Sequence, residues 1–214
     1  MVQAIRDIRV DGEPLDEANV PWMLLFVLWN ALTYPGSYGL WTLTDILSRP
    51  ALVKQLREES ELDARLDVLK ACFLETARLN PVSSLPRMLT APIEFESEGK
   101  RWWIPAGGYV AALPGVLNVA PKTFPEPMRW DPHRHLGDAS TQPHVFGHGA
   151  FSCVARAFVL STLPALMDEL LIGWDLTLQG RLPQRVVRVH LTYSSDPIRA
   201  TVGRRGGAPE SATP

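Results

Sequence analysis

The stretch of residues 22–47 constrains the fold more than any other part of the chain. Apolar side chains lie on nearly every face of a helix through this stretch, and such a helix is normally buried. Pro21 suits its first turn, and Asp16 or Asn19 can cap its start. Residues 34–39 contain a proline and two glycines, which predict a kink or a break. The fold must therefore provide cover for this helix on every side.

The chain is long enough, at 214 residues, for one domain with a sizeable core. Its net charge of −2 gives no indication of a nucleic-acid partner. Residues 1–10 lack a signal-peptide pattern, and the apolar run of residues 21–32 is too short to span a bilayer. Two cysteines, Cys72 and Cys153, make no disulfide framework and indicate a reducing, intracellular compartment; a bridge between them is the alternative.

Hydrophobic periodicity and turn signals predict an α+β fold that is mainly helical. The face formed by Leu69, Phe73 and Ala77 identifies one amphipathic helix, which Pro81 ends. A polar tail rich in glycine and proline, residues 203–214, is predicted to be disordered. Helices are predicted at residues 22–47, 50–59, 62–79 and 154–171, and strands at 88–95, 101–104, 109–113, 175–178 and 186–193.

A glycine-punctuated loop, FGHGAFSC at residues 146–153, ends in Cys153 and leads directly into a predicted helix. Gly147 and Gly149 allow positive φ angles and the close approach of a flat group. The positive end of the helix dipole favours a thiolate at Cys153. This cysteine is therefore a candidate nucleophile or metal ligand, and the alternative is a buried structural cysteine.

Four histidines lie near Cys153, and together with it they could form a zinc site. His144 and His148 have the H-x3-H spacing of zinc sites, and His133 and His135 lie upstream. The region has no second cysteine, and its proline-rich loops are poorly suited to closing a tetrahedral site. Otherwise each histidine is expected to be an exposed loop residue.

Glu75 and Arg78 lie three residues apart on a predicted helix, so their side chains can pair. An exposed pair would contribute less than about 1 kcal/mol. The neighbouring apolar side chains favour burial, and a buried carboxylate needs a complete set of partners. The helix thus predicts a buried ion pair, with an exposed pair as the alternative.

Three motifs in order resemble those of the cytochrome P450 family. Phe146, Gly149 and Cys153 match the cysteine loop F-x-x-G-x-R-x-C-x-G, and Glu75 and Arg78 match E-x-x-R. Residues 124–127 and 130–134 are similar to the F-x-P-x-R region. The resemblance runs from about residue 20 to residue 178 and, less clearly, onward to about residue 200. It implies the C-terminal, haem-binding half of that fold, without the N-terminal half.

The resemblance also implies roles for individual residues. Cys153 would be the axial ligand of haem iron, and Arg134 would join Glu75 and Arg78 in a structural triad. Arg87 would pair with a haem propionate, with a surface arginine on a strand as the alternative. The remaining residues expected around haem are Phe146, Gly149 and His148.

The sequence departs from the family pattern at two places. Phe151 stands where an arginine or histidine usually pairs with a propionate, and Ala155 replaces a glycine. In the long apolar helix, Thr33 and Tyr34 fall where the family usually has an acid and a threonine. Leu28, Trp29 and Trp41 resemble the branch of prostacyclin synthase and the sterol 7-alpha-hydroxylases, some of whose members lack that acid–alcohol pair.

The implied function is monooxygenation of a lipophilic small molecule, using O₂ and electrons from a redox protein. A haem-thiolate isomerase or dehydratase that does not consume O₂ is the second hypothesis. The third is a non-catalytic fragment or pseudoenzyme that needs a partner chain. Residues 1–202 would form a partial haem domain without the N-terminal helices that cover part of the helix 22–47 in the family. An exposed apolar patch on that helix is therefore expected, and with it a missing N-terminal half or self-association. Any membrane anchor would lie outside this chain.

Overall fold

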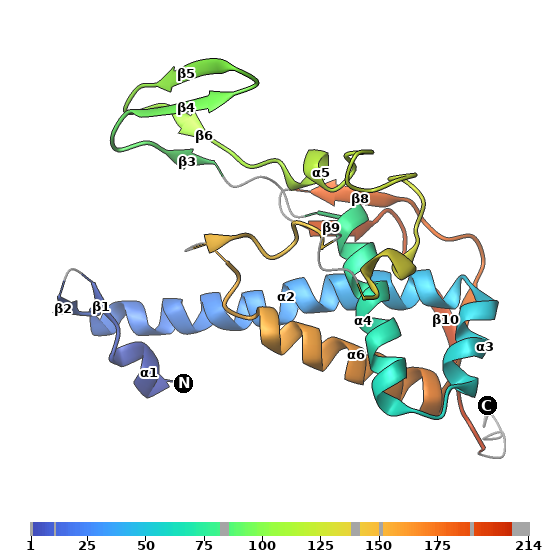
Figure 1. Cartoon of the computed structure of the whole chain (residues 1–214). Coiled ribbons are helices and arrows are strands. Elements are labelled where there is room, and N and C mark those ends of the chain that lie inside the picture. Colours follow the sequence, from blue (N-terminus) through green and yellow to red (C-terminus); the bar gives the residue numbers. More distant parts are fainter. Residues whose placement is uncertain are drawn as a thin grey trace.

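The computed structural model describes residues 2–10, 12–81, 86–137, 142–149, 152–188 and 191–206. Its body consists of helices that cross one another, with small sheets at the periphery (Figure 1). The helices are α1 (Val2–Arg6), α2 (Val20–Leu47), α3 (Pro50–Glu58), α4 (Leu62–Leu79), α5 (Pro114–Leu117) and α6 (Arg156–Gly173), with 3-10 turns η1 (Glu17–Asn19) and η2 (Pro132–His135). This confirms the mainly helical α+β prediction.

Helix boundaries follow local signals in the sequence. Helix α3 begins at Pro50, whose missing N–H costs nothing in a first turn. Helix α4 ends at Leu79, two residues before Pro81, because the residue that precedes a proline disfavours helical geometry. Arg57 caps the end of α6, because it donates to Leu171 O in the last turn at 3.0 Å and to the carbonyl of the C-cap residue Trp174 at 2.9 Å.

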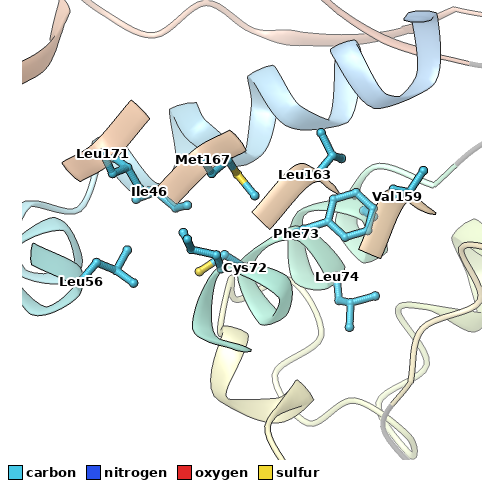
Figure 2. Close-up of a cluster of buried hydrophobic side chains, with 11 residues drawn as sticks. Ile46, Leu56, Cys72, Phe73, Leu74, Val159, Leu163, Met167 and Leu171 are labelled. Carbon is cyan, nitrogen blue, oxygen red and sulfur yellow. The ribbon is translucent and has the colours of Figure 1, made fainter. Parts of the chain in front are cut away.

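The hydrophobic core lies where α2, α4 and α6 meet (Figure 2). Gly39 lets α2 approach α6 closely, since a Cβ there would lie 3.3 Å from Leu163 Cδ2. Cys72 is completely buried in this core, and burial raises the pKa of its thiol to about 12. The buried members of the core are Ile46, Leu56, Leu69, Cys72, Phe73, Leu74, Ala77, Val159, Leu163, Met167 and Leu171.

Helix α2 bears on two expectations drawn from the sequence. The predicted break is wrong, because α2 is one helix through Pro35; a proline removes a single intrahelical hydrogen bond, and the flanking turns keep theirs. Cover of the helix is also incomplete, which agrees with the exposed apolar patch expected for it. Trp41 is 2% exposed, whereas Trp22 and Leu32 are 71% and 73% exposed. The α2 residues of the core and its edge are Tyr38, Leu43, Ile46 and Leu47, all in the C-terminal half.

The described strands form two-stranded antiparallel sheets. The predicted strand 88–95 divides into β3 and β4 at Pro92, which has no N–H to donate. The predicted strand 186–193 is instead a hairpin of two strands, β8 and β9. Strand β10 extends to Arg204, into the segment 203–214 that was predicted to be disordered. Residues 207–214 of that segment lie outside the described residues. The pairs are β1 (Arg9–Val10) with β2 (Glu13–Pro14), β3 (Arg87–Met88) with β6 (Tyr109–Val110), β4 (Ile93–Ser97) with β5 (Lys100–Ile104), β7 (Trp174–Gln179) with β10 (Arg199–Arg204), and β8 (Arg185–Arg188) with β9 (Leu191–Ser194).

Among the described helices, none combines the length and the apolar character needed to cross a membrane.

Candidate functional site

The ion pair of Glu75 and Arg78 lies at the centre of a buried polar cluster. Both side chains are 0% exposed. Arg78 Nε lies 2.7 Å from Glu75 Oε2, and Arg78 Nη2 lies 2.8 Å from Oε1. This two-point contact is the strong form of an arginine–carboxylate bond. The predicted pair is therefore present, and the alternative of an exposed helix pair does not hold.

The segment that carries η2 surrounds the same carboxylate. Arg134 Nε lies 3.2 Å from Glu75 Oε1, and the Asp131 amide donates to that oxygen at 2.9 Å. His135 Nε2 lies 2.8 Å from Oε2. His135 is buried, whereas an exposed loop residue was expected. Its contact spans 60 positions, so no local pattern could have identified it; its place directly after Arg134 was the only signal.

Glu75 stays ionised in this setting. Burial by itself raises the pKa of its carboxyl group, but hydrogen bonds from Arg78, His135 and the Asp131 amide outweigh burial and lower the pKa to about 2. Because the carboxylate accepts, His135 Nε2 carries the proton and donates. The cluster thus combines one carboxylate with two guanidinium groups, Arg78 and Arg134.

A second polar cluster lies beside the first and was not foreseen from the sequence. Thr76 Oγ1 donates to Asp45 Oδ2 at 2.8 Å and accepts from Trp130 Nε1 at 3.0 Å. Arg185 Nη2 donates to Asp45 Oδ1 at 2.6 Å. The guanidinium of Arg49 lies 3.9 Å from the centre of the Trp130 ring. These contacts connect α2, α4, β8 and the segment before η2.

The cysteine loop is held at its two ends. The Cys153 amide donates to Phe146 O at 2.7 Å, which closes the loop just before α6. Gly147 and Gly149 have φ angles of +68° and +61°, the left-handed region that favours glycine. Cys153 is exposed, so the alternative of a buried structural cysteine does not hold. Phe151 lies outside the described residues.

The zinc and disulfide alternatives receive no support from the geometry. His144 Nδ1 and His148 Nε2 lie 2.8 Å apart. In the part of the chain that the structure describes, no three His, Cys, Asp or Glu side chains are close enough to hold a metal ion. Cys72 and Cys153 are both free thiols, one buried and one exposed.

The remaining predicted site residues lie apart from the Glu75 cluster. Thr33 Oγ1 donates to Trp29 O at 2.5 Å within α2, so its proton is engaged by the helix itself. Tyr34 is half-buried on the same helix. Arg87 is exposed on β3, in the part of the molecule that projects from the helices, and donates to Pro86 O at 3.2 Å (Figure 1).

The comparison with protein families matches residues 40–184 to the family described as Cytochrome P450. The chain belongs to the cytochrome P450 family. The matched residues include both polar clusters except for Arg185, together with the whole cysteine loop. Membership in this family implies a haem cofactor with its iron.

Individual relatives agree with this assignment. The chain is 30% identical over 209 residues to 24-hydroxycholesterol 7-alpha-hydroxylase of Homo sapiens, covering 86% of this chain and 43% of that protein. It is 26% identical over 222 residues to lanosterol 14-alpha demethylase of Cunninghamella elegans, covering 85% and 43%. Fusicoccin H C-9 hydroxylase of Phomopsis amygdali is 29% identical over 168 residues, covering 66% and 32%. The chain thus spans about two fifths or less of the length of these relatives.

The residues present fit a haem cofactor. P450 haem iron takes a single thiolate from the protein, and Cys153 is an exposed thiol at the end of a glycine loop. The open side of that loop is also suited to a flat group, because a Cβ placed on Gly149 would meet no atom of the described residues within 4 Å. The donor set and the shape of the loop therefore agree with the family.

Proposed function

We propose that this chain forms the haem-thiolate part of a P450 monooxygenase that acts on a lipophilic small molecule. The observation that carries the proposal is the combination of a buried Glu75–Arg78–Arg134 cluster with an exposed Cys153 on a glycine loop, both within the matched region. The cluster holds the supporting segment against α4, and the loop presents a thiol to a flat cofactor.

Cys153 is the residue that would ligate haem iron, with Phe146, Gly149 and His148 beside it. When bound, haem supplies the O₂ chemistry, and its thiolate ligand favours O–O cleavage. The protein's own contribution is to hold the thiol. The closed Phe146 O to Cys153 N hydrogen bond at 2.7 Å fixes the backbone at the ligand position. Arg87 and His148 are proposed as propionate partners, because Phe151 cannot donate a hydrogen bond.

The substrate class follows from the relatives. Two of the three compared above are named for action on sterols, lanosterol and 24-hydroxycholesterol. We infer a sterol-like lipophile for this chain, with electrons delivered by a separate redox protein.

One observation favours a second function, a haem-thiolate isomerase or dehydratase. Thr33 donates its hydroxyl proton to Trp29 O at 2.5 Å, and residues 30–35 contain no carboxylate. A helix without a free acid–alcohol pair is poorly equipped to deliver protons during O₂ activation. An isomerase that starts from a peroxide does not need that delivery.

Oxygen labelling separates the two functions. The haem-loaded chain is supplied with a sterol, a P450 reductase, NADPH as electron donor and ¹⁸O₂, and in a second arm with a lipid peroxide alone. We expect a slow reaction that places one labelled oxygen atom in the sterol product. Rearrangement of the peroxide, with no labelled sterol in the first arm, would favour the isomerase instead.

A further inference from the structure

Asn118 connects the buried Glu75 cluster to the start of the cysteine loop. Its backbone carbonyl accepts a hydrogen bond from Arg78 Nη1 at 2.6 Å. Its side-chain Oδ1 accepts one from the His144 amide at 2.7 Å. Asn118 itself is 0% exposed. One residue thus contacts two parts of the chain that lie 40 positions before it and 26 positions after it.

The short helix α5 fixes the backbone of Asn118. Helix α5 begins at Pro114, and Asn118 follows its last residue with helical φ and ψ angles of −72° and −13°. The Asn118 amide donates back to Pro114 O at 2.8 Å. The turn thus holds the Asn118 backbone so that its carbonyl faces Arg78 and its side chain faces the His144 amide.

The contact at His144 continues to the cysteine. Two positions later, the Phe146 ring packs on Phe73 of α4 with ring centres 6.1 Å apart. The Phe146 carbonyl then accepts the Cys153 amide at 2.7 Å. An unbroken series of contacts therefore runs from Arg78 through Asn118, His144 and Phe146 to Cys153.

We propose that Asn118 is a positioning residue that sets the cysteine loop relative to the Glu75 cluster and so keeps Cys153 in place as a ligand. This inference rests on the proposed function, since it takes Cys153 as the thiolate ligand. Without the Asn118 acceptor, the partly buried His144 amide loses its partner, and an unpartnered buried donor is unfavourable. The start of the loop, at His144, is then free to move away from residue 118. The hydrogen bond from Arg78 to the backbone carbonyl of residue 118 remains.

The side-chain nitrogen of Asn118, which makes no hydrogen bond to the described residues, determines the choice of variants. Asn118 Nδ2 is buried and has no hydrogen-bond partner among the described residues. Asn118→Asp keeps the Oδ acceptor and loses only this N–H₂ group, and Arg78, bonded to the Asn118 carbonyl, lies next to the added charge. Asn118→Leu keeps a similar volume and removes the acceptor. The two variants therefore separate the hydrogen bond from the packing.

The first measurement is amide hydrogen exchange of the peptide covering residues 142–149 in the haem-free chain. We expect exchange at the His144 amide to become roughly tenfold faster in Asn118→Leu, the effect of losing one hydrogen bond, and to stay near the wild-type rate in Asn118→Asp. Equal rates in Asn118→Leu and wild type would overturn the proposal. Asn118→Ala carries the same expectation if the leucine variant does not fold.

The second measurement is the spectrum of the reduced, CO-treated, haem-loaded chain. At equal haem content, we expect the share of haem with the thiolate-type band to fall roughly twofold or more in Asn118→Leu and to be retained in Asn118→Asp. An unchanged share in Asn118→Leu would contradict a positioning role. A wild-type chain without that band would contradict the proposed function, whereas the exchange measurement would still decide whether Asn118 holds the loop.

Discussion

At the scale of single residues, the buried Glu75 carboxylate is the centre of a dense set of polar contacts. Two guanidinium groups, an imidazole and a backbone amide all reach it, from Arg78, Arg134, His135 and Asp131. Glu75→Ala leaves two arginines without their carboxylate, so we expect it to destabilise the fold by roughly 3–5 kcal/mol in denaturant unfolding. Glu126→Ala, which removes an exposed partner of Arg129, is the matched control. A Glu75→Ala chain with the wild-type unfolding midpoint would refute the structural role.

The same carboxylate predicts how stability depends on pH. The pKa of Glu75 falls from its ordinary 4.5 to about 2 in the folded chain. Its stabilising contribution is therefore fully present above about pH 4.5 and is lost as pH falls towards 2. The contribution is roughly 3 kcal/mol, since one pKa unit corresponds to about 1.4 kcal/mol.

Glu75→Gln should remove this part of the acid dependence. We expect the free energy of unfolding of wild type to fall more steeply than that of Glu75→Gln between pH 4.5 and pH 2. Glu126→Gln should behave like wild type, because Glu126 is exposed. Parallel curves for wild type and Glu75→Gln would show that the carboxylate is not held in its ionised form.

Only some contacts of the candidate site could be predicted from the sequence. The Glu75–Arg78 pair was predictable because three positions on a helix place side chains on one face. His135, Asp45 and Asn118 were not, because their key contacts span 60, 31 and 26 positions. Contacts of that range depend on the tertiary fold, and no local pattern encodes them.

At the scale of elements, boundaries were predicted where proline acts at a helix end. Pro50 and Pro81 delimit α3 and α4 as expected. Pro35 does not break α2, because a long helix with partners at one end tolerates one missing N–H. The hairpin β8–β9 was read as one strand, since residues 186–193 contain no glycine or proline that would indicate a turn.

The Asp45 cluster joins these elements and can be tested at Thr76. Thr76→Val keeps the shape of the side chain but removes the hydroxyl that donates to Asp45 and accepts from Trp130. We expect a loss of roughly 1–3 kcal/mol, because buried polar groups are left without partners. Thr123→Val, at an exposed position, is the control. Denaturant unfolding measures the loss of free energy of unfolding. If Thr76→Val loses no more than the control, the cluster does not stabilise the packing of α2 on α4.

At the scale of the whole molecule, apolar surface is the dominant feature. Trp22, Trp29 and Leu32 on α2 are 71%, 67% and 73% exposed. A further apolar groove of about 410 Å³ lies between α2, α6 and the β7–β10 sheet. Its lining includes Leu40, Leu43, Leu47, Leu170, Trp174, Leu176, Leu178, Ile198 and Val202. Surfaces of this kind are normally covered by another protein surface.

We therefore predict that the isolated chain self-associates or needs a second polypeptide, and that its turnover is slow. Light scattering during size-exclusion chromatography should give a mass above the 23.8 kDa of one chain. Replacing Trp22 and Trp29 by glutamine should lower that mass, whereas replacing the buried Trp41 should instead impair folding. A wild-type chain that runs as a single monomer would contradict the prediction.

The central claim is that Cys153 is the haem ligand of this P450 chain, and the spectrum of the reduced, CO-treated protein tests it most directly. Wild type should show the strongly red-shifted Soret band of a thiolate ligand. Cys153→Ala should abolish that band, and Cys72→Ala, which changes the buried thiol, should retain it. A red-shifted band that persists in Cys153→Ala would contradict the claim.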